Sequence, residues 1–262
     1  MNTRHVDDQP VALLWSGGWD STYRLLHLAV VESRPVQPIY ALDHLRQSSL
    51  HELAAMLAVR DAVAARHPAA VGLLRPTQLY LVSEIPVLEE VTARYRSLSS
   101  RFRLGGQFEW LPRLAATSGM TGLELAIERN EYRPRDPVFA YLGRWLVERG
   151  GALELDERVP DADLLLFRHF RFPLYHQTKR QMLDASRRHG FCDILLRSWF
   201  CHRPRRGKPC GTCHPCIDAM EEGFAFRVPA ASRARYHAYA AKRALKRLLR
   251  RAGAARLPRM GN

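Results

Sequence analysis

The apolar residues of the chain fall into short blocks with two different periodicities. Short, mostly apolar runs predict strands at residues 11–15, 38–42, 78–85, 122–127 and 162–167. Apolar residues three or four positions apart predict helices at residues 21–32, 50–66, 87–98, 111–120, 136–149 and 179–189. Strands that alternate with helices in this way predict an α/β fold, an open parallel sheet with helices on both faces.

The ends of the later helices are marked by proline and glycine. Pro137 suits the first turn of the helix at 136–149, and Gly150 and Gly151 are expected to end it. Beyond these elements, residues 230–257 are rich in Ala, Arg and Lys and predict one long basic helix. We therefore expect one body at residues 1–228, which includes a cysteine cluster, and a basic helical tail at 229–262.

One short segment interrupts the first strand–helix unit with residues that suit neither element. It reads Ser16-Gly17-Gly18-Trp19-Asp20-Ser21-Thr22. Glycines let the backbone approach a ligand closely, and the start of the following helix directs free N–H groups toward an anion. The hydroxyls of Ser16, Ser21 and Thr22 add donors. Helix capping alone accounts for Asp20 or Ser21 but not for the whole set, so the segment predicts a phosphate site.

Asp20 needs a separate explanation, because a carboxylate beside a phosphate repels the ligand. A Mg²⁺ ion between Asp20 and the phosphate oxygens removes that conflict. The spacing also excludes two common phosphate motifs. The segment lacks the Gly-Lys-Ser/Thr of kinase-type nucleotide-binding loops and the third glycine of dinucleotide-binding folds.

Four of the five cysteines lie close together near the end of the expected body. They are Cys201, Cys210, Cys213 and Cys216. Two short Cys-x-x-Cys spacings let four thiolates close a tetrahedron around Zn²⁺, which would be structural because no coordination position stays open. Independent buried cysteines or a redox pair are the alternatives. His202 and His214 are further ligand types that four thiolates leave unneeded, and Cys192 is expected to be a packed thiol.

The formal net charge of +14 is concentrated at the C-terminal end. Eleven Lys and Arg and no acid follow Glu222, whereas the preceding residues carry 29 cations against 26 acids. Such a tail fits a nucleic acid, an acidic protein partner or an anionic membrane surface. Alternatively, its leucine face packs on the body or on a second subunit, which would make a homodimer.

The chain shows no sign of a membrane span or an export signal. No stretch approaches the roughly 20 apolar residues that cross a bilayer. The N-terminal sequence MNTRHVDDQP is polar and has no signal-peptide core. We therefore expect a cytoplasmic protein.

The segment from Ser16 to Ser21 resembles the SGGxDS signature of the PP-loop ATP pyrophosphatases. These enzymes bind the β,γ-phosphates of ATP and transfer AMP to a substrate oxygen, with release of pyrophosphate. Together with the CGxCxxC of the cysteine cluster, the signature resembles the zinc-containing 7-cyano-7-deazaguanine synthases. Pro173, Leu174 and Lys179 resemble that family's "PL…K" segment, and the similarity covers most of residues 11–219.

The resemblance implies an adenine nucleotide alpha hydrolase-like fold and an ATP-dependent, AMP-forming ligase. Its reaction activates a carboxylate of a 7-deazapurine as an acyl-adenylate, and ammonia converts this to an amide and then a nitrile. The implied ATP and Mg²⁺ site comprises Ser16, Gly17, Gly18, Asp20, Ser21 and Thr22. Asp20 and Lys179 would be catalytic, with Arg197 as a weaker phosphate ligand.

The substrate segments of this family are only partly present. Gln47 and Glu52 fit its GQxHxxEL stretch and would border the substrate, but the histidine falls on Ser49. Arg113 partly matches an Arg-Asn segment. The family also has a YPDCRPEF segment. At the positions of its acid and its arginine, this chain has Pro134 and Asp136 instead. This pattern favours retained ATP chemistry on a changed acceptor.

Other acceptors and one non-enzymatic function therefore stay open. A related PP-loop enzyme adenylates a tRNA base, with the tail binding the RNA. Another variant attaches a deazapurine to a protein or to DNA. A third hypothesis is a nucleotide-binding module that links a nucleotide signal to a protein partner.

Overall fold

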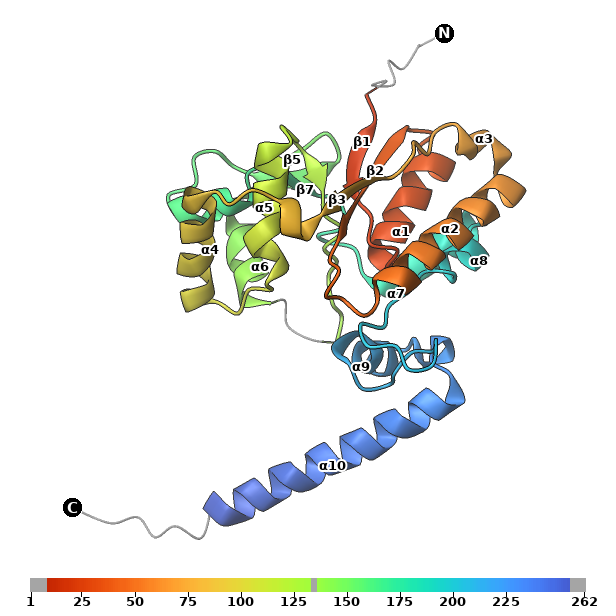
Figure 1. The fold of residues 1–262 in the computed structure, drawn as a ribbon, viewed down its shortest axis with the longest axis vertical. Helices are drawn as coiled ribbons and strands as arrows, with labels where there is room; N and C mark the ends of the chain where they lie inside the picture. The colour runs from red at the N-terminus through yellow and green to blue at the C-terminus, as the bar shows by residue number, and fades with distance from the viewer. Residues whose placement is uncertain (1–8, 133–135, 255–262) are drawn as a thin grey trace, which may run out of the picture. The chain divides into compact units, whose positions relative to one another are not determined.

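The structure is a computed structural model that describes residues 9–132 and 136–254, with side chains as far as residue 249 (Figure 1). It divides into two compact units, Met1–Trp199 and Phe200–Asn262. The predicted boundary between residues 228 and 229 lies inside the second unit. The cysteine cluster and the basic helix thus belong to one unit.

A sheet of seven strands, counted over the described residues, forms the centre of the first unit. Its order is β3-β2-β1-β4-β7-β6-β5. The strands are β1 (Val11–Leu14), β2 (Val36–Leu42), β3 (Gln78–Leu81), β4 (Leu123–Glu124), β5 (Leu146–Arg149), β6 (Ala152–Leu155) and β7 (Phe170–Phe172). The β3-β2-β1-β4-β7 part is parallel, and β6 runs antiparallel to both of its neighbours. The predicted α/β fold with a mostly parallel sheet is confirmed.

Helices flank this sheet in two groups (Figure 1). One group contains α1 (Trp19–Leu26), which continues as a π-helix at His27–Val31, with α2 (Ser49–Arg66), α7 (Lys179–Arg188) and α8 (Cys192–Leu195). The other contains α4 (Glu89–Arg101), α5 (Gln107–Thr117) and α6 (Pro137–Leu142), while the short α3 (Pro68–Val71) follows α2. Strand β1 contributes side chains to the packing on both faces of the sheet. Ala12 and Leu14 pack into the core beneath α5, and the fully buried Leu13 alternates with them.

The order of the strands places a switch point beside β1. From β1 the chain adds β2 and then β3 on one side, and it then crosses to β4 on the other side. In open α/β sheets, ligands bind outside the carboxyl ends of the strands at this point. The segment after β1 therefore lies where a ligand pocket is expected.

The predicted helix at residues 136–149 is wrong in its second half. Helix α6 ends at Leu142, a 3₁₀ turn covers Gly143–Trp145, and β5 follows. Gly150 and Gly151 have positive φ angles of 56° and 76° and connect β5 to β6 as a two-residue hairpin. Positive φ at both turn positions is typical of tight hairpins. The glycines end a strand rather than a helix.

The predicted strand at residues 162–167 is also wrong, because Ala162–Phe167 forms a 3₁₀-helix. The side chain of Asp161 accepts a hydrogen bond from the backbone N–H of Asp163 and starts this turn. The nearby strand is Phe170–Phe172, three positions further along the chain. A short apolar run does not by itself distinguish a buried strand from a buried helix.

The second unit consists of the cysteine loop, α9 (His214–Glu221), a 3₁₀ turn at Ala225–Arg227 and α10 (Ala230–Ala254). The predicted basic helix is confirmed through Ala254, and residues 255–257 of that prediction lie outside the described residues. Over the part of the chain that the structure describes, none of the helices has the length and apolar character needed to cross a membrane.

Candidate functional site

The loop after β1 has a conformation that only glycine suits. Gly17 has a φ of +67°, and a Cβ added there would lie 2.9 Å from the backbone oxygen of Glu52 on α2. The backbone oxygen of Gly17 accepts a hydrogen bond of 2.8 Å from the N–H of Trp199. The loop is therefore held from two sides, by α2 and by the end of the first unit.

Hydroxyl groups organise the same loop from within. The backbone N–H of Ser16 donates to Oγ of Ser21 at 3.3 Å, and the two hydroxyls lie 3.3 Å apart. The N–H of Gly18 donates to Oγ of Ser16 at 3.4 Å. Gly18 is the N-cap of α1, so the loop leads directly to the positive end of that helix. These contacts bring Ser16, Gly18 and Ser21 together, as the sequence predicts.

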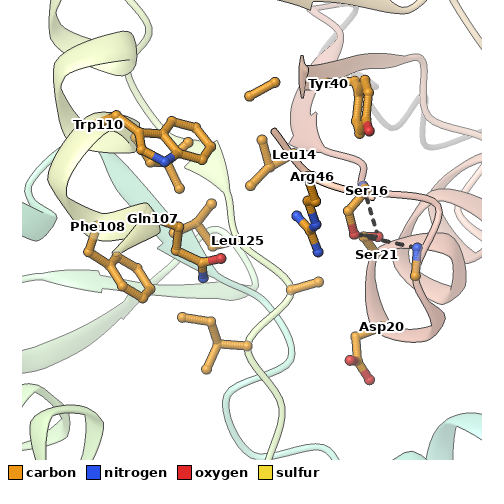
Figure 2. Close-up of a pocket in the computed structure, with 15 residues that line it drawn as sticks. Leu14, Ser16, Asp20, Ser21, Tyr40, Arg46, Gln107, Phe108, Trp110 and Leu125 are labelled. Atoms are coloured by element: carbon orange, nitrogen blue, oxygen red, sulfur yellow. Dashed lines mark hydrogen bonds between the residues drawn. The ribbon is translucent and has the colours of Figure 1, made fainter. Parts of the chain in front are cut away.

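A pocket opens beside this loop at the carboxyl ends of β1, β2 and β4 (Figure 2). Its polar side includes Ser16, Gly18, Asp20, Ser21 and Arg46. The opposite side is formed by α5, through Gln107, Phe108, Trp110 and Leu111, and by the segment Leu125, Ala126 and Ile127 that follows β4. The pocket thus joins hydroxyl, carboxylate and guanidinium groups to an aromatic wall.

Arg46 is one of the pocket residues that sequence reasoning missed, as are Gln107, Phe108 and Trp110 on the opposite side. Arg46 lies after β2, and its Nε donates to Oγ of Ser48 at 3.1 Å while Nη2 lies 3.2 Å from Oε1 of Glu52. Glu52 is buried and also accepts hydrogen bonds from Ser48 at 2.7 Å and Tyr40 at 2.9 Å. Burial and the adjacent Glu52 carboxylate raise the pKa of Tyr40, which keeps this phenol a donor. Glu52 therefore positions Arg46 and does not line the pocket.

Gly17 and three further predicted residues also lie away from the pocket lining. Thr22 is fully buried, and its Oγ1 accepts a hydrogen bond of 3.0 Å from Nε1 of Trp15. Gln47 is exposed. Arg113 is buried on α5 and forms an ion pair of 2.8 Å with Glu109. Their predicted roles in binding ATP or substrate stay predictions.

Lys179 is the first residue of α7, behind a capping box formed by Thr178 and Gln181. Its Nζ lies 3.3 Å from Oε1 of Glu128, which directly follows Ile127 in the pocket wall. The structure thus links the start of α7 to the segment after β4. Arg197, the weaker phosphate prediction, is exposed.

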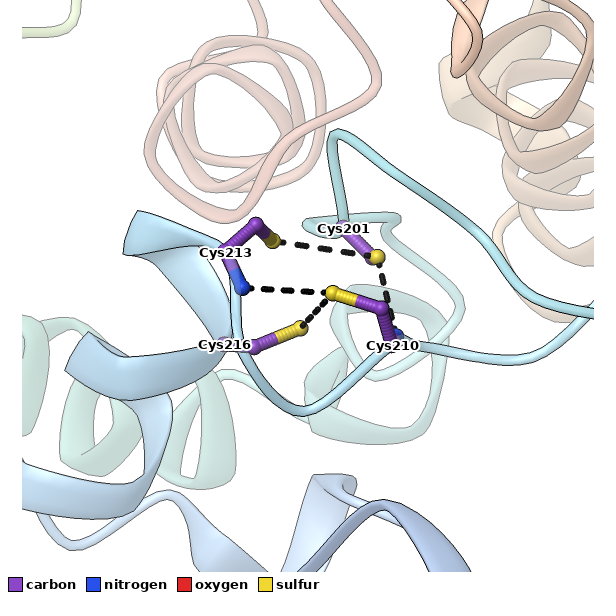
Figure 3. Close-up of side chains that lie close together, drawn as sticks. All are labelled: Cys201, Cys210, Cys213 and Cys216. Carbon is purple, nitrogen blue, oxygen red and sulfur yellow. Dashed lines mark hydrogen bonds between the residues drawn. The ribbon is translucent and has the colours of Figure 1, made fainter. Parts of the chain in front are cut away.

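The four clustered cysteines converge in the second unit (Figure 3). Their sulfur atoms all lie within 4.8 Å of one another. The Sγ atoms of Cys201 and Cys213 are 3.8 Å apart, and those of Cys210 and Cys216 are 3.9 Å apart. A tetrahedron with metal–sulfur bonds of about 2.3 Å has edges of about 3.8 Å. The cluster therefore has the donor set and spacing that hold a metal ion such as zinc.

Backbone N–H groups support the sulfur atoms. The N–H of Cys210 donates to Sγ of Cys201 at 3.1 Å, while those of Thr212 and Cys213 donate to Sγ of Cys210 at 3.3 and 3.2 Å. Without a cation the thiols compete for protons, and the hydrogen bond to Cys213 raises the pKa of Cys201 to about 12. A bound cation permits all four to ionise. Cys192 lies outside the cluster, half-buried on α8.

The fold and the two sites define an α/β protein with a polar pocket at the switch point of its sheet and a separate four-cysteine cluster. No family model, curated protein or solved structure matches the chain.

Proposed function

We propose that the first unit is an ATP-dependent, AMP-forming ligase that adenylates a carboxylate of a 7-deazapurine-type substrate. The observation that carries the proposal is the Ser-Gly-Gly-Trp-Asp-Ser loop, of which Ser16, Gly18, Asp20 and Ser21 line a pocket at the carboxyl end of β1. Its position beside the switch point supports nucleotide binding. The resemblance of the loop to the SGGxDS signature supports cleavage between the α- and β-phosphates.

The polar side of the pocket has the donor types that a nucleotide triphosphate requires. The hydroxyls of Ser16 and Ser21 and the guanidinium of Arg46 would bind phosphate oxygens. The carboxylate of Asp20 would hold Mg²⁺, which neutralises phosphate charge. Arg46 is supported by Glu52 and Ser48, so its side chain is oriented before a ligand arrives.

The opposite side would bind the planar substrate. Phe108 and Trp110 provide aromatic surface for stacking, and Gln107 provides an amide that both donates and accepts. A substrate carboxylate oxygen then attacks the α-phosphorus, and the bond from phosphorus to the pyrophosphate oxygen breaks. Ammonia attacks the acyl carbon, loses a proton and displaces AMP to give an amide. A second ATP then adenylates the amide oxygen with release of pyrophosphate, and loss of AMP together with both N–H protons gives the nitrile.

Mass spectrometry of the products tests this proposal. The protein is incubated with ATP, Mg²⁺, ammonium and 7-carboxy-7-deazaguanine, and AMP, pyrophosphate and the amide or nitrile are expected together. Asp20→Asn should lower AMP formation about 100-fold, because phosphate charge is then no longer neutralised by a held metal. Asp61→Asn on the exposed side of α2 removes the same charge and should leave the rate unchanged. Full activity of Asp20→Asn contradicts the metal role.

The same measurement separates the acceptors that the sequence leaves open. AMP formation that requires added tRNA identifies a base-modifying enzyme. A mass increase on a protein or on DNA identifies a conjugating enzyme. Tight ATP binding without AMP formation on any acceptor identifies a nucleotide-binding module.

For the second unit, we propose that Cys201, Cys210, Cys213 and Cys216 hold one structural Zn²⁺ ion. Metal analysis of the purified protein should then give about one equivalent of zinc per chain. Cys213→Ser should lower this content by more than half, whereas Cys192→Ser, outside the cluster, should retain it. Zinc below half an equivalent in the folded wild-type protein contradicts the proposal.

A further inference from the structure

Nearly all of the net charge belongs to the second unit. Residues 200–262 contain 15 Lys and Arg against three acids, a net charge of +12 out of the +14 of the whole chain. The first unit is therefore almost neutral. The positive region begins in the cysteine loop, well before the tail that the sequence singles out.

The cysteine loop presents its cations on a tight hairpin. Arg205 and Lys208 pair across it, and the turn residues Arg206 and Gly207 have φ angles of 50° and 71°. Left-handed backbone is unfavourable for a residue with a side chain, so Arg206 holds an uncommon conformation at the tip. Arg203 is exposed together with the three cations of this hairpin. We call residues 203–208 the basic hairpin.

Helix α10 is fixed to the base of the basic hairpin. Oγ of Ser232 donates to the backbone oxygen of Pro209 at 2.5 Å, and Nε of Arg235 donates to that of Cys210 at 2.8 Å. Gly211 has a φ of +85°, and a Cβ added there would clash with the backbone oxygen of Ser232. The basic hairpin and the first turns of α10 thus form one packed body.

The later turns of α10 extend beyond the rest of the unit (Figure 1). Lys242, Arg243, Lys246 and Arg247 are exposed there, and the guanidinium of Arg243 lies 5.7 Å from the ring centre of Tyr239. The spacing of a helix places these cations and Tyr239 on one side, and Ala241, Ala244, Leu245 and Leu248 on the other. Tyr239 is 37% exposed, so an aromatic ring is accessible among the cations.

We propose that the second unit binds single-stranded nucleic acid through the basic hairpin and residues 239–247 of α10. Twelve of the 15 cations of this unit are arginines, which suit the oxygens of phosphodiesters. A ring within the cationic side offers a stacking surface for a base. This surface goes beyond the proposed ligase activity and does not depend on it.

The same observations disfavour other occupants of this surface. A second copy of α10 is repelled, because residues 223–262 carry no acid to pair with its cations. A helix that lies on a bilayer needs bulky residues on its apolar side and aromatic rings near it. Here two of the four residues on that side are alanines, and the ring of Tyr239 lies among the cations instead. Folded acidic partners lack the bases that Tyr239 would stack on.

Fluorescence anisotropy of the zinc-loaded, full-length protein with a labelled 20-nucleotide RNA tests the proposal, with single-stranded DNA of the same sequence in parallel. Binding should weaken as salt is added. A plot of the logarithm of the association constant against the logarithm of the salt concentration should have a slope of about −0.7 for each phosphate contacted. Lys242→Glu with Lys246→Glu should weaken binding about tenfold or more and reduce that slope by about 1.4. Arg205→Glu with Lys208→Glu should weaken binding and reduce the slope by the same amounts. The zinc content of this variant is measured to verify that its cysteine loop is folded.

The matched control is Arg96→Glu with Arg103→Glu, which reverses two exposed charges of the first unit and should leave binding unchanged. Three results would overturn the proposal. They are wild-type binding weaker than about 100 μM at physiological salt, equal weakening by the control pair, and tighter binding to phosphatidylserine vesicles or polyglutamate than to either oligonucleotide.

Discussion

Gly17 combines a left-handed backbone with a contact that leaves no space for a methyl group. Its φ is +67°, and α2 lies against it at Glu52 and Met56. Gly17→Ala should lower the free energy of unfolding by about 1–3 kcal/mol, because alanine strains the backbone at this φ angle and its methyl group displaces α2. Urea unfolding measures this difference.

Gly72 provides the comparison for this substitution. It has ordinary helical angles, and a Cβ added there meets nothing within 4 Å. Gly72→Ala should therefore leave the protein as stable as the wild type or slightly more stable. A loss of stability as large as that of Gly17→Ala would show that alanine is poorly tolerated for some reason other than the geometry of the loop.

Residues of the pocket differ in how far the sequence can reveal them. Four of them lie within one six-residue segment, so the sequence alone shows that they are close together at the start of a helix. They are Ser16, Gly18, Asp20 and Ser21. Arg46 belongs to another loop and reaches the pocket only because β2 pairs with β1. Its one sequence signal is its position just after a predicted strand, at the same edge of the sheet.

A buried ionic network ties helix α1 to strand β4. Arg24 donates to both oxygens of Glu124 at 2.7 and 2.9 Å and to Glu32 at 2.6 Å, and Glu32 also contacts His27 at 2.9 Å. The hydrogen bond from His27, followed by Arg24, lowers the pKa of Glu32 from 4.5 to about 2. Charged Glu32 therefore stabilises the fold above its ordinary pKa.

This network predicts a specific pH dependence. A carboxyl whose pKa is lower in the folded protein loses its contribution as pH falls from about 5 to 2. The Glu32 side chain is 28% exposed and partly screened, so we expect about 2 kcal/mol from this group. Urea unfolding at several pH values should show that Glu32→Gln is less stable at pH 7 and equal to the wild type near pH 2. Glu84→Gln, at an exposed position, should follow the wild-type curve; a constant difference for Glu32→Gln would contradict the charge argument.

Helices and strands are predicted correctly where their periodicity is long. The prediction fails where pairing with another strand determines whether a segment is helix or strand. The helical pattern of residues 50–66 is long, and α2 follows it closely. Leu146–Arg149 continues a helical pattern but gains backbone hydrogen bonds by pairing with β6, which two glycines with positive φ bring alongside. Neither the partner strand nor the turn geometry is visible in the local periodicity.

At the scale of the whole molecule, metal removal should affect the two units differently. The N–H groups of Cys210, Thr212 and Cys213 donate to sulfur atoms that a cation would hold in place. Hydrogen exchange after chelation should therefore rise in residues 200–228 and in the first turns of α10, whereas amides of β1 and β2 keep their protection. A uniform rise across both units would contradict separate stabilisation.

The division into units is a property of contacts rather than composition. The change in charge after Glu222 suggests a boundary near residue 228. Ser232 and Arg235 instead bind the backbone of the cysteine loop, and these two side chains join the helix to that loop. The alternation of strands and helices, by contrast, is a global pattern, and it predicts the fold class correctly.

The position of the pocket at the switch point also determines when it can form. Its two walls belong to strands that pair through Leu13 and Glu124, and Glu124 binds an arginine 100 residues earlier in the chain. During synthesis, the glycine loop leaves the ribosome long before its opposite wall exists. Closing such a distant contact is slow compared with forming a helix. The β1–β2 half can assemble early, and the pocket should form only after the segments around Gln107 and Leu125 have joined it.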